Sequence, residues 1–367
     1  MIIAIDARPL SRPLTGIGRY TYNLIKQLVE LDSRHVWHLY SDQPLAAHIP
    51  KLPNIHVKTG NVKSDIVSTL FAQAIFSVWA RKDNIDVFWS PRHHLPLLLP
   101  RKVKKIVTIH DIVWYRHPET MPTSRKWLER LLMPPSLAAS DHIIAVSDFT
   151  KHELSNALGI RADKVTVTTL APTPLPTPKT SNFPPEHIKK PFYLFVGTLE
   201  PRKNLGNLLT AFSEFSLENP DINLVIAGKD GWGKVSVADI SEDLGIRDKV
   251  AILGFVSDET LHTLYKNCSA LLMPSLYEGF GLPAIEALYY CKPVIATTNS
   301  AITPALSPLV INTTDHSAQA ILQAMNRLKK TPAQAAQAAP GLNIHTWADC
   351  AALTMDVLTM DVLTLDV

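Results

Sequence analysis

The sequence predicts an α/β protein with two doubly wound domains, each built on a parallel sheet. Apolar strand-like runs alternate with amphipathic helical runs in both halves, which is the order that forms parallel sheets with crossover helices. The proline-rich segment 171–185 interrupts this alternation. At 367 residues, the chain is also too long for one ordinary core. We expect domains at 1–172 and 191–345, a linker at 173–190 and a C-terminal helix at 346–367.

The first half is predicted to contain seven strands. β-branched and aromatic residues mark them, at residues 2–6, 36–40, 55–57, 85–89, 106–109, 142–147 and 165–168. Apolar residues at helical spacing predict helices over 20–30 and 66–79. Ser147 is expected to cap the helix that starts at Phe149. Residues 90–100 hold too many prolines for regular structure.

The second half repeats the pattern after the linker. Its predicted strands cover residues 192–196, 224–228, 250–255, 268–273 and 293–297, and its predicted helices cover 205–215, 261–265 and 284–290. Ser257 is the expected cap of the helix at 261–265. Near the C-terminus, Leu-Thr-Met-Asp-Val occurs at 353–357 and 358–362 and recurs in varied form at 363–367. Three short copies are too few for a solenoid, and their pattern indicates no function.

Composition favours a reducing cytoplasm. The N-terminus enters a strand-like run with no basic region or cleavage site before it, so we expect no signal peptide. The apolar runs fall short of the roughly 20 residues that a membrane-spanning helix needs. Three widely spaced cysteines, Cys268, Cys291 and Cys350, argue against disulfides and against a zinc site.

Charge is distributed unevenly along the chain. Residues 1–173 hold 22 Lys and Arg against 14 Asp and Glu, a balance of +8, and residues 174–367 have a balance of −5. A basic half suggests an anionic partner, unless the difference is drift of surface charge. Nucleic acid fits poorly because RNA-binding aromatic motifs and a helix-turn-helix are missing from the sequence. A phosphorylated substrate or an anionic membrane surface fits better. The basic amphipathic stretch at 125–133 is expected to turn its apolar residues to the core, with membrane contact as the alternative.

A glycine turn with two glutamates follows the strand at 268–273. Gly279, Phe280, Gly281 and Leu282 connect this strand to a helix that has Pro283 in its first turn. Glycines let backbone N–H groups approach a ligand, and a helix N-terminus favours an anion such as phosphate. The flanking carboxylates, Glu278 and Glu286, suit sugar hydroxyls, although a plain turn with two solvated glutamates would have the same sequence.

Comparable strand-to-helix turns occur elsewhere in the chain. Gly16 and Gly18 precede the first helix but lack the third glycine of a dinucleotide fingerprint. In the second half, Gly197 is followed by Arg202 and Lys203. A guanidinium fork beside an ammonium point charge suits a diphosphate.

A histidine ends the predicted strand at 106–109. Ligands of open α/β sheets bind at the carboxyl ends of the strands, where His110 is expected to lie. Acid–base catalysis or polarisation of a substrate would suit this position, although a lone histidine is more often structural.

Together these motifs resemble the retaining glycosyltransferases of the GT-B fold, in particular the nucleotide-sugar glycosyltransferases of family 4. The resemblance spans residues 2 to about 350. Its specific segments follow the family's order and are residues 15–19, His110-Asp111, Ala145-Val146-Ser147, residues 197–204 and the two glutamates of residues 278–286. It implies two Rossmann-like domains with an interdomain cleft, the first binding the acceptor and the second the nucleotide sugar. It also implies that the C-terminal helix packs back on the first domain.

The resemblance implies a role for each candidate residue. Gly16 and Gly18 would approach the diphosphate and the acceptor, and Arg202 and Lys203 would neutralise the diphosphate without a metal or another cofactor. In the same way, Glu278 would contact the donor sugar's hydroxyls, Glu286 the ribose, and His110 the anomeric centre. The remaining donor contacts would come from Gly197, Gly279, Phe280, Gly281 and Leu282.

The expected activity is transfer of a hexose, with mannose from GDP-mannose as the leading donor, to a lipid-linked or polysaccharide acceptor. O-antigen, capsule and exopolysaccharide assembly are the bacterial processes that this implies. The expected location is the cytoplasm, with peripheral contact at the inner face of the plasma membrane. Two alternatives stay open at this point, a nucleotide-sugar epimerase and a non-catalytic partner subunit. One departure from the family is Ala305, where members often have a glutamate.

Overall fold

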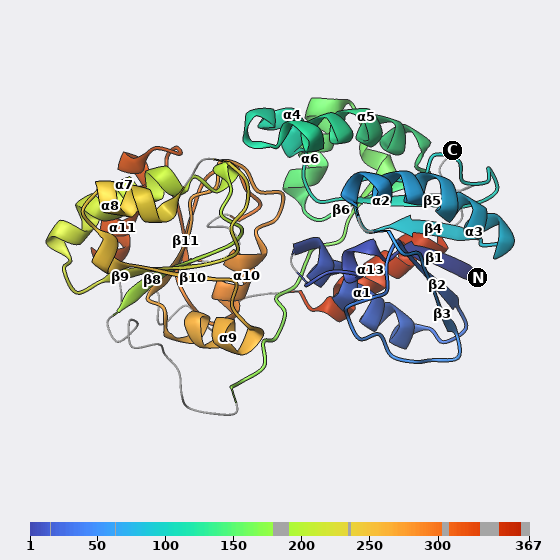
Figure 1. Cartoon of the computed structure of the whole chain (residues 1–367), viewed down its shortest axis with the longest axis horizontal. Helices are drawn as coiled ribbons and strands as arrows, with labels where there is room; N and C mark the ends of the chain where they lie inside the picture. The colour runs from blue at the N-terminus through green and yellow to red at the C-terminus, as the bar shows by residue number, and fades with distance from the viewer. Residues whose placement is uncertain are drawn as a thin grey trace. The chain divides into compact units, whose positions relative to one another are not determined.

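The computed structural model describes residues 1–14, 16–62, 64–178, 191–233, 236–302, 308–330 and 345–360. They form two compact units (Figure 1). The first comprises Met1–Ile112, Ser124–Ala171 and His345–Val367, and the second comprises Val113–Thr123 and Pro172–Ile344. The linker at 173–190, the turn around Ala305 and the terminal repeat lie partly outside the described residues.

The first unit is built on a seven-stranded sheet in the order β3-β2-β1-β4-β5-β6-β7. Its strands are β1 (Ile2–Asp6), β2 (Val36–Ser41), β3 (Ile55–Thr59), β4 (Val87–Ser90), β5 (Lys104–Ile109), β6 (His142–Ala145) and β7 (Val165–Val167). Every neighbouring pair is parallel, and β1 pairs with both β2 and β4. The order therefore reverses at β1, as it does in doubly wound sheets, and the prediction of a parallel sheet is confirmed.

The unit also contains helices, most of which connect these strands. They are η1 (Arg8–Leu10), α1 (Gly16–Leu31), α2 (Asp65–Phe71), the π-helical η2 (Ala72–Phe76), α3 (Ser77–Lys82), α5 (Thr123–Ala139), α6 (Asp148–Leu158), η4 (Ala162–Lys164) and α13 (Trp347–Thr359). The single helix predicted over 66–79 is thus three consecutive segments. Ser147 caps α6 as predicted, because its Oγ accepts from the Thr150 N–H at 3.0 Å.

Helix α13 belongs to the first unit, where it packs beside α1 (Figure 1). A capping box between Thr346 and Asp349 starts it. At its other end, the Lys104 ammonium donates to the Val357 carbonyl at 2.7 Å and also to the Met360 carbonyl. A cation at this position complements the negative end of the helix dipole.

Helix α5 contradicts, for Trp127 and Leu131, the prediction that the apolar residues of 125–133 face the core. Trp127 is 61% exposed and Leu131 is 70% exposed, whereas Glu129 and Met133 are buried. The helix extends beyond the predicted stretch to Ala139, and its buried residues also include Ser136 and Leu137. Counted from Glu129, the other buried residues follow at four, seven and eight positions, so they lie on one helix face. With this face buried, Trp127 and Leu131 point outward.

The second unit is built on a six-stranded parallel sheet in the order β10-β9-β8-β11-β12-β13. Its strands are β8 (Phe192–Val196), β9 (Asn223–Ala227), β10 (Val250–Gly254), β11 (Ala270–Met273), β12 (Val294–Ala296) and β13 (Val310–Asn312). Its helices are α4 (Val113–Arg116), η3 (Pro118–Thr120), η6 (Pro201–Lys203), α7 (Leu205–Glu218), α8 (Val237–Asp243), η7 (Arg247–Lys249), α9 (Asp258–Asn267), α10 (Leu282–Tyr289) and α11 (Ala318–Lys330). Figure 1 places α7, α8 and α11 on one face of this sheet and α9 and α10 on the other. Ser257 caps α9, as predicted.

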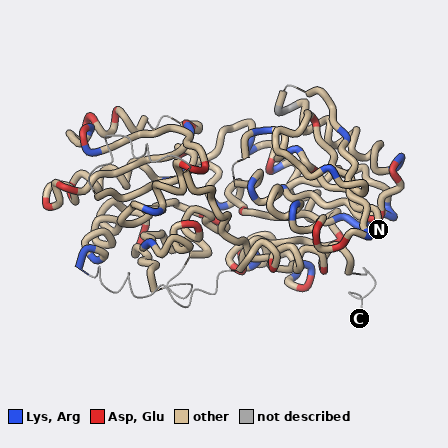
Figure 2. The backbone as a smooth tube through the Cα atoms, turned by 90° about the horizontal axis from the view of Figure 1, so that it is seen from below, with Lys and Arg blue, Asp and Glu red and all other residues tan. Residues whose placement is uncertain are grey.

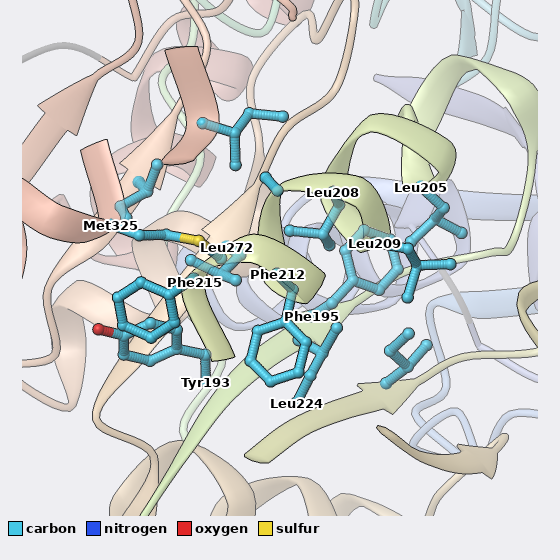
Figure 3. Packing of buried hydrophobic residues seen from close by; sticks show 14 of the residues in the cluster. Tyr193, Phe195, Leu205, Leu208, Leu209, Phe212, Phe215, Leu224, Leu272 and Met325 are labelled. Atoms are coloured by element: carbon cyan, nitrogen blue, oxygen red, sulfur yellow. The ribbon is translucent and has the colours of Figure 1, made fainter. Parts of the chain in front are cut away.

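The core of the second unit lies between its sheet and helices α7 and α11 (Figure 3). Phe212 and Phe215 of α7 pack with Tyr193 and Phe195 of β8, and Met325 closes the cluster from α11. Burying one such aromatic side chain stabilises the fold by about 2–3 kcal/mol. This packing holds the carboxyl end of β8 in place, where Arg202 and Lys203 follow.

Charged residues of both signs occur along the chain in each unit (Figure 2). Cys268, Cys291 and Cys350 are free thiols. In the part of the chain that the structure describes, every helix is too short or too polar to cross a lipid bilayer.

Candidate active site

The structure brings Arg202, Lys203 and Glu278 together in the second unit. Arg202 and Lys203 lie in η6, which follows β8, and Glu278 lies in the turn that follows β11. Strands β8 and β11 are parallel neighbours, so their carboxyl ends share one edge of the sheet. The pairing of β8 with β11 therefore brings Lys203 to a carboxylate 75 residues away, with Arg202 beside it.

The Glu278 carboxylate is bound on both oxygens. Its Oε2 lies 2.9 Å from Arg202 Nη1, and its Oε1 pairs with Lys203 Nζ and accepts from Ser275 Oγ at 2.6 Å. Burial opposes ionisation of this group, but the Arg202 and Lys203 cations outweigh burial and lower the pKa of Glu278 to about 2. Glu278 is therefore ionised at neutral pH.

Glu200 is a further member of the cluster that the sequence motifs did not single out. Its Oε1 lies 2.7 Å from Arg202 Nη2 and accepts from Arg202 Nε at 3.0 Å. Two carboxylates thus balance two cations at a site where all four side chains are largely buried. An incoming dianion could displace the Glu278 carboxylate from Lys203 and Arg202. Buried cations bind a new anion strongly only when the carboxylate that already neutralises them moves away.

The glycine turn after Glu278 leads into α10. Gly281 occupies the N-cap position with φ +96°, and Pro283 lies in the first turn as predicted. A Cβ at Gly281 would come within 3.1 Å of both Ile302 and Met273, so both the backbone and the space favour glycine here. Phe280 is buried and Leu282 is the first residue of the helix. Donor binding by this turn, Gly279 included, stays a prediction.

Glu286 belongs to a different hydrogen-bond network from that of Glu278. It is buried in α10, and its Oε2 accepts from the Tyr265 hydroxyl of α9 at 2.8 Å. The Tyr265 ring in turn stacks on Tyr290 at 5.6 Å. The sequence could not indicate the contact between Tyr265 and Glu286, because the two residues lie 21 positions apart on different helices. The predicted contact of Glu286 with a ribose remains to be tested.

Gly197 lies directly after β8 and beside Lys203. A Cβ at Gly197 would lie 3.5 Å from the Lys203 Cε, an ordinary packing distance. The structure therefore places Gly197 next to the cation cluster, as the sequence order suggests.

The segment 113–123 adds unpredicted residues to the second unit. The Trp232 Nε1–H donates to the Thr120 carbonyl at 2.7 Å. The His117 ring lies 5.9 Å from the ring of Tyr277, which precedes Glu278. In sequence, this segment follows β5 of the first unit, so no local pattern indicated that it packs here.

Gly16 and Gly18 do not form a loop before the first helix, because they lie in its first turn. Gly16 has φ +31° and a Cβ on it would meet no atom, whereas a Cβ on Gly18 would lie 3.1 Å from the Pro9 carbonyl. Gly18 thus allows η1 and α1 to approach each other. Contact with a donor or an acceptor stays a prediction for both glycines.

His110 follows β5 in the first unit and is held in one tautomer. Its Nε2 lies 2.9 Å from the Pro91 carbonyl, which can only accept, so Nε2 carries the proton. Burial, with His93 nearby, lowers the pKa of His110 to about 4. At neutral pH, His110 is therefore an uncharged imidazole whose Nδ1 can accept a hydrogen bond.

A buried group of ionisable side chains, of which His93 contacts His110, was not predicted. Glu129 of α5 lies 2.9 Å from His94 Nε2 and 3.5 Å from His93 Nδ1. Burial would raise the pKa of Glu129, but the two histidines hold it well below its ordinary value. Glu129 lies 35 residues from His94 in a helix that the sequence presents as an ordinary amphipathic stretch, so spacing could not reveal the group.

Two family models match the chain. Residues 14–169 match the model described as Glycosyltransferase Family 4, and residues 178–340 match the model described as Glycosyl transferases group 1. The two matches correspond to the two halves of the chain and together include every candidate site residue named above.

Among curated proteins, the chain is 29% identical over 331 residues to O-antigen chain mannosyltransferase B of Escherichia coli, covering 82% of this chain and 84% of that protein. It is 25% identical over 305 residues to O-antigen chain mannosyltransferase RfbU of Salmonella typhimurium, covering 80% and 81%.

Solved structures share the fold at lower identity. Sucrose-phosphate synthase from Thermosynechococcus elongatus has a TM-score of 0.73 at 18% identity, covering 97% of this chain and 94% of that one. WaaG, a glycosyltransferase involved in lipopolysaccharide biosynthesis, has a TM-score of 0.73 at 15% identity, covering 98% and 100%. At these identities the likeness concerns the fold alone, and it confirms the GT-B prediction.

Proposed function

This chain belongs to the glycosyltransferases that the family 4 and group 1 models describe, and we propose that it transfers mannose from GDP-mannose to a lipid-linked or polysaccharide acceptor. The two mannosyltransferase relatives named above support mannose as the sugar and O-antigen assembly as the process. The single structural observation that carries the proposal is the pairing of Arg202 and Lys203 with Glu278. This arrangement can accept a diphosphate and release a carboxylate toward the donor sugar.

The proposed chemistry begins at the leaving group. Breaking the bond between the sugar and the diphosphate leaves negative charge on the diphosphate and positive charge on the sugar ring. Arg202 and Lys203 would bind the diphosphate, the role that metal ions have in other transferases. We therefore expect transfer to continue in the presence of EDTA.

On the sugar side of the reaction, we propose one role for Glu278 in the second unit and another for His110 in the first. Once the diphosphate binds the cations, the Glu278 carboxylate can accept hydrogen bonds from sugar hydroxyls. The neutral His110 ring, protonated on Nε2, offers Nδ1 as a second acceptor. We propose retention of the anomeric configuration, with the acceptor attacking from the face that the diphosphate leaves.

The donor is tested by a thermal-shift screen of GDP-, UDP-, ADP- and dTDP-sugars on the purified chain, since a ligand stabilises according to its affinity and concentration. GDP-mannose should raise the unfolding temperature most, and Lys203→Met should abolish the rise. A larger rise with another nucleotide would reject GDP-mannose. The product's anomeric configuration by NMR then tests retention.

The lipid-linked acceptor is supported by the outward face of α5. Trp127, Leu131, Pro134 and Ala138 are all exposed at helical spacing, so they form an apolar stripe on that face. The Arg130 guanidinium lies 5.7 Å from the Trp127 ring centroid and places positive charge beside the stripe. Apolar and basic side chains mixed on one helix face suit the surface of an anionic bilayer.

Beside this helix, the loop that carries the exposed Leu98 is fixed to the same unit. Leu98 is 64% exposed, and its carbonyl accepts from Arg81 Nη2 of α3 at 3.0 Å. The Leu95 N–H of the same loop donates to Ser136 Oγ of α5 at 3.0 Å. A second apolar side chain is thus presented from a loop that is tied to α5. We propose an anionic membrane as the occupant of this surface.

Vesicle sedimentation tests this surface. The chain should bind vesicles that contain phosphatidylglycerol and not vesicles of phosphatidylcholine alone. Replacing Trp127 and Leu131 by serine should weaken binding by about tenfold or more. Leu217→Ser, which changes an 81%-exposed leucine in the second unit, is the matched control. Equal binding by the double variant, or a dimer that the double variant disrupts, would contradict the proposal.

The relatives weigh against the epimerase alternative, because both named curated proteins are mannosyltransferases. A non-catalytic subunit would lack turnover of its own. If the purified chain transfers sugar and Lys203→Met abolishes this transfer, the alternative of a non-catalytic subunit is excluded.

A further inference from the structure

The loop after β4 holds His110 at two points. The Pro91 carbonyl accepts from the His110 ring at Nε2, 2.9 Å away. The His93 ring binds the main chain instead, because its Nε2 accepts from the His110 N–H at 3.2 Å. One loop therefore fixes both the backbone and the side chain of His110.

This loop is itself anchored. The Ser90 hydroxyl lies within hydrogen-bond distance of the Arg92 and His94 carbonyls, at 2.8 and 2.7 Å. Glu129 of α5 binds His94 Nε2 at 2.9 Å and faces His93 Nδ1 at 3.5 Å. All three of these ionisable side chains, His93, His94 and Glu129, are less than one-tenth exposed.

The hydrogen bonds define the state of the His93 ring. Nε2 can accept from the His110 N–H only while it carries no proton, so the ring proton lies on Nδ1, toward Glu129. Glu129 thus orients His93, and His93 orients the backbone of His110. The same order of carboxylate, imidazole and functional group is common where a reacting side chain needs one fixed position.

We propose that His93 is a positioning residue for sugar transfer, holding the main chain at His110 so that the His110 ring keeps one orientation toward the donor sugar. This inference rests on the proposed role of His110. His93 itself touches no substrate in this account. Its effect is on turnover, because small displacements of a reacting group cost rate and not ground-state binding.

His94 is the natural comparison. It is buried like His93 and binds the same glutamate, but it makes no hydrogen bond to His110 among the described residues. A purely structural role for the histidine–glutamate group would make the two histidines equivalent. A positioning role makes only His93 important for the rate.

Three variants separate these readings. His93→Gln keeps an acceptor oxygen close to the position of Nε2, whereas His93→Asn is too short to reach the His110 N–H. We expect His93→Asn to lower kcat by about tenfold or more with little change in the donor KM, and His93→Gln to recover most of that rate. His94→Asn should lower the unfolding temperature about as much as His93→Asn while keeping kcat near that of the wild type.

His110→Ala distinguishes failure of this inference from failure of the proposed function. A slow His110→Ala together with a fast His93→Asn would overturn the inference alone. A His110→Ala variant with wild-type turnover would overturn the inference and the proposed role of His110 but not sugar transfer itself, whereas absence of transfer by the wild-type chain would overturn the proposed function. Long-range proton–nitrogen correlation spectra of the histidine rings give a readout without turnover: the wild type should show His110 protonated on Nε2, and this signal should broaden or shift in His93→Asn but not in His94→Asn. An unchanged His110 signal in His93→Asn would also contradict the inference.

Discussion

At the scale of single residues, the candidate site consists of charges that satisfy one another. Arg202 and Lys203 are both paired with Glu278, and Arg202 is also paired with Glu200. The sequence indicated three of these four residues, because their position after a strand and their charge are local properties. Glu200 escaped notice because only the folded turn of η6 shows that it faces Arg202. The same holds for Glu129 and His93, whose contact depends on the packing of α5.

Replacing Glu278 by glutamine tests whether it competes with the diphosphate. The change removes a buried negative charge from Lys203 and Arg202, so GDP should bind more tightly, by about tenfold. Transfer should be slower by about 100-fold, because the carboxylate that serves the sugar is lost. Calorimetry and the rate of GDP release measure the two effects. Weaker GDP binding than in the wild type would contradict this account, and Glu214→Gln on α7 is the control.

At the scale of elements, most strands and helices followed from periodicity, and the exceptions have physical causes. Glycines 16 and 18 are helical because α1 starts earlier than its apolar pattern. Helix α5 exposes Trp127 because the face that is buried is the one that carries Glu129 and Met133. Periodicity reveals that a helix has two faces, but in α5 both faces hold large apolar residues. Sequence alone could not decide which face is buried.

Lys104 should hold the C-terminal end of α13 on the first unit. Lys104→Met removes the ammonium that donates to the Val357 and Met360 carbonyls. We expect a loss of about 1.5–3 kcal/mol in the free energy of unfolding, the range for hydrogen bonds to a charged group. Hydrogen exchange should speed up over residues 354–360 while the second unit is unchanged. Exchange as slow as in the wild type, or equal acceleration in exposed Lys51→Met, would contradict this role.

At the scale of the whole molecule, the two units differ in their buried histidines. In the first unit, burial lowers the pKa of His110 and His142 to about 4 each and also lowers that of His94. Glu129 raises the pKa of His93 against the effect of burial, which works in the opposite direction. In the second unit, burial lowers the pKa of His316.

These shifts predict that acid weakens the first unit before the second. A histidine in the unfolded chain has a pKa near 6.5, whereas His110 and His142 in the folded chain have a pKa of about 4. Between these two pH values, the unfolded chain binds protons that the folded chain does not bind, and this favours unfolding. Their stabilisation is complete above about pH 6.5 and falls as the pH drops toward 4. Glu278, with a pKa of about 2, keeps its contribution above about pH 4.5 and loses it as the pH falls toward 2. Hydrogen exchange at about pH 7 and pH 5 should show β5 and β6 losing protection while β8 and β11 keep it. Loss in β8 first would contradict the prediction.

The activity that we propose for the cation–carboxylate cluster of the second unit is sugar transfer from a nucleotide donor. It is tested most directly by the initial rate of GDP release from GDP-mannose in the presence of a lipid-linked acceptor. The wild-type chain should release GDP and mannosylate the acceptor, with EDTA present or absent. Lys203→Met should lower both rates by about 100-fold or more. Equal rates in the wild type and Lys203→Met, or no release from any nucleotide sugar, would contradict the account.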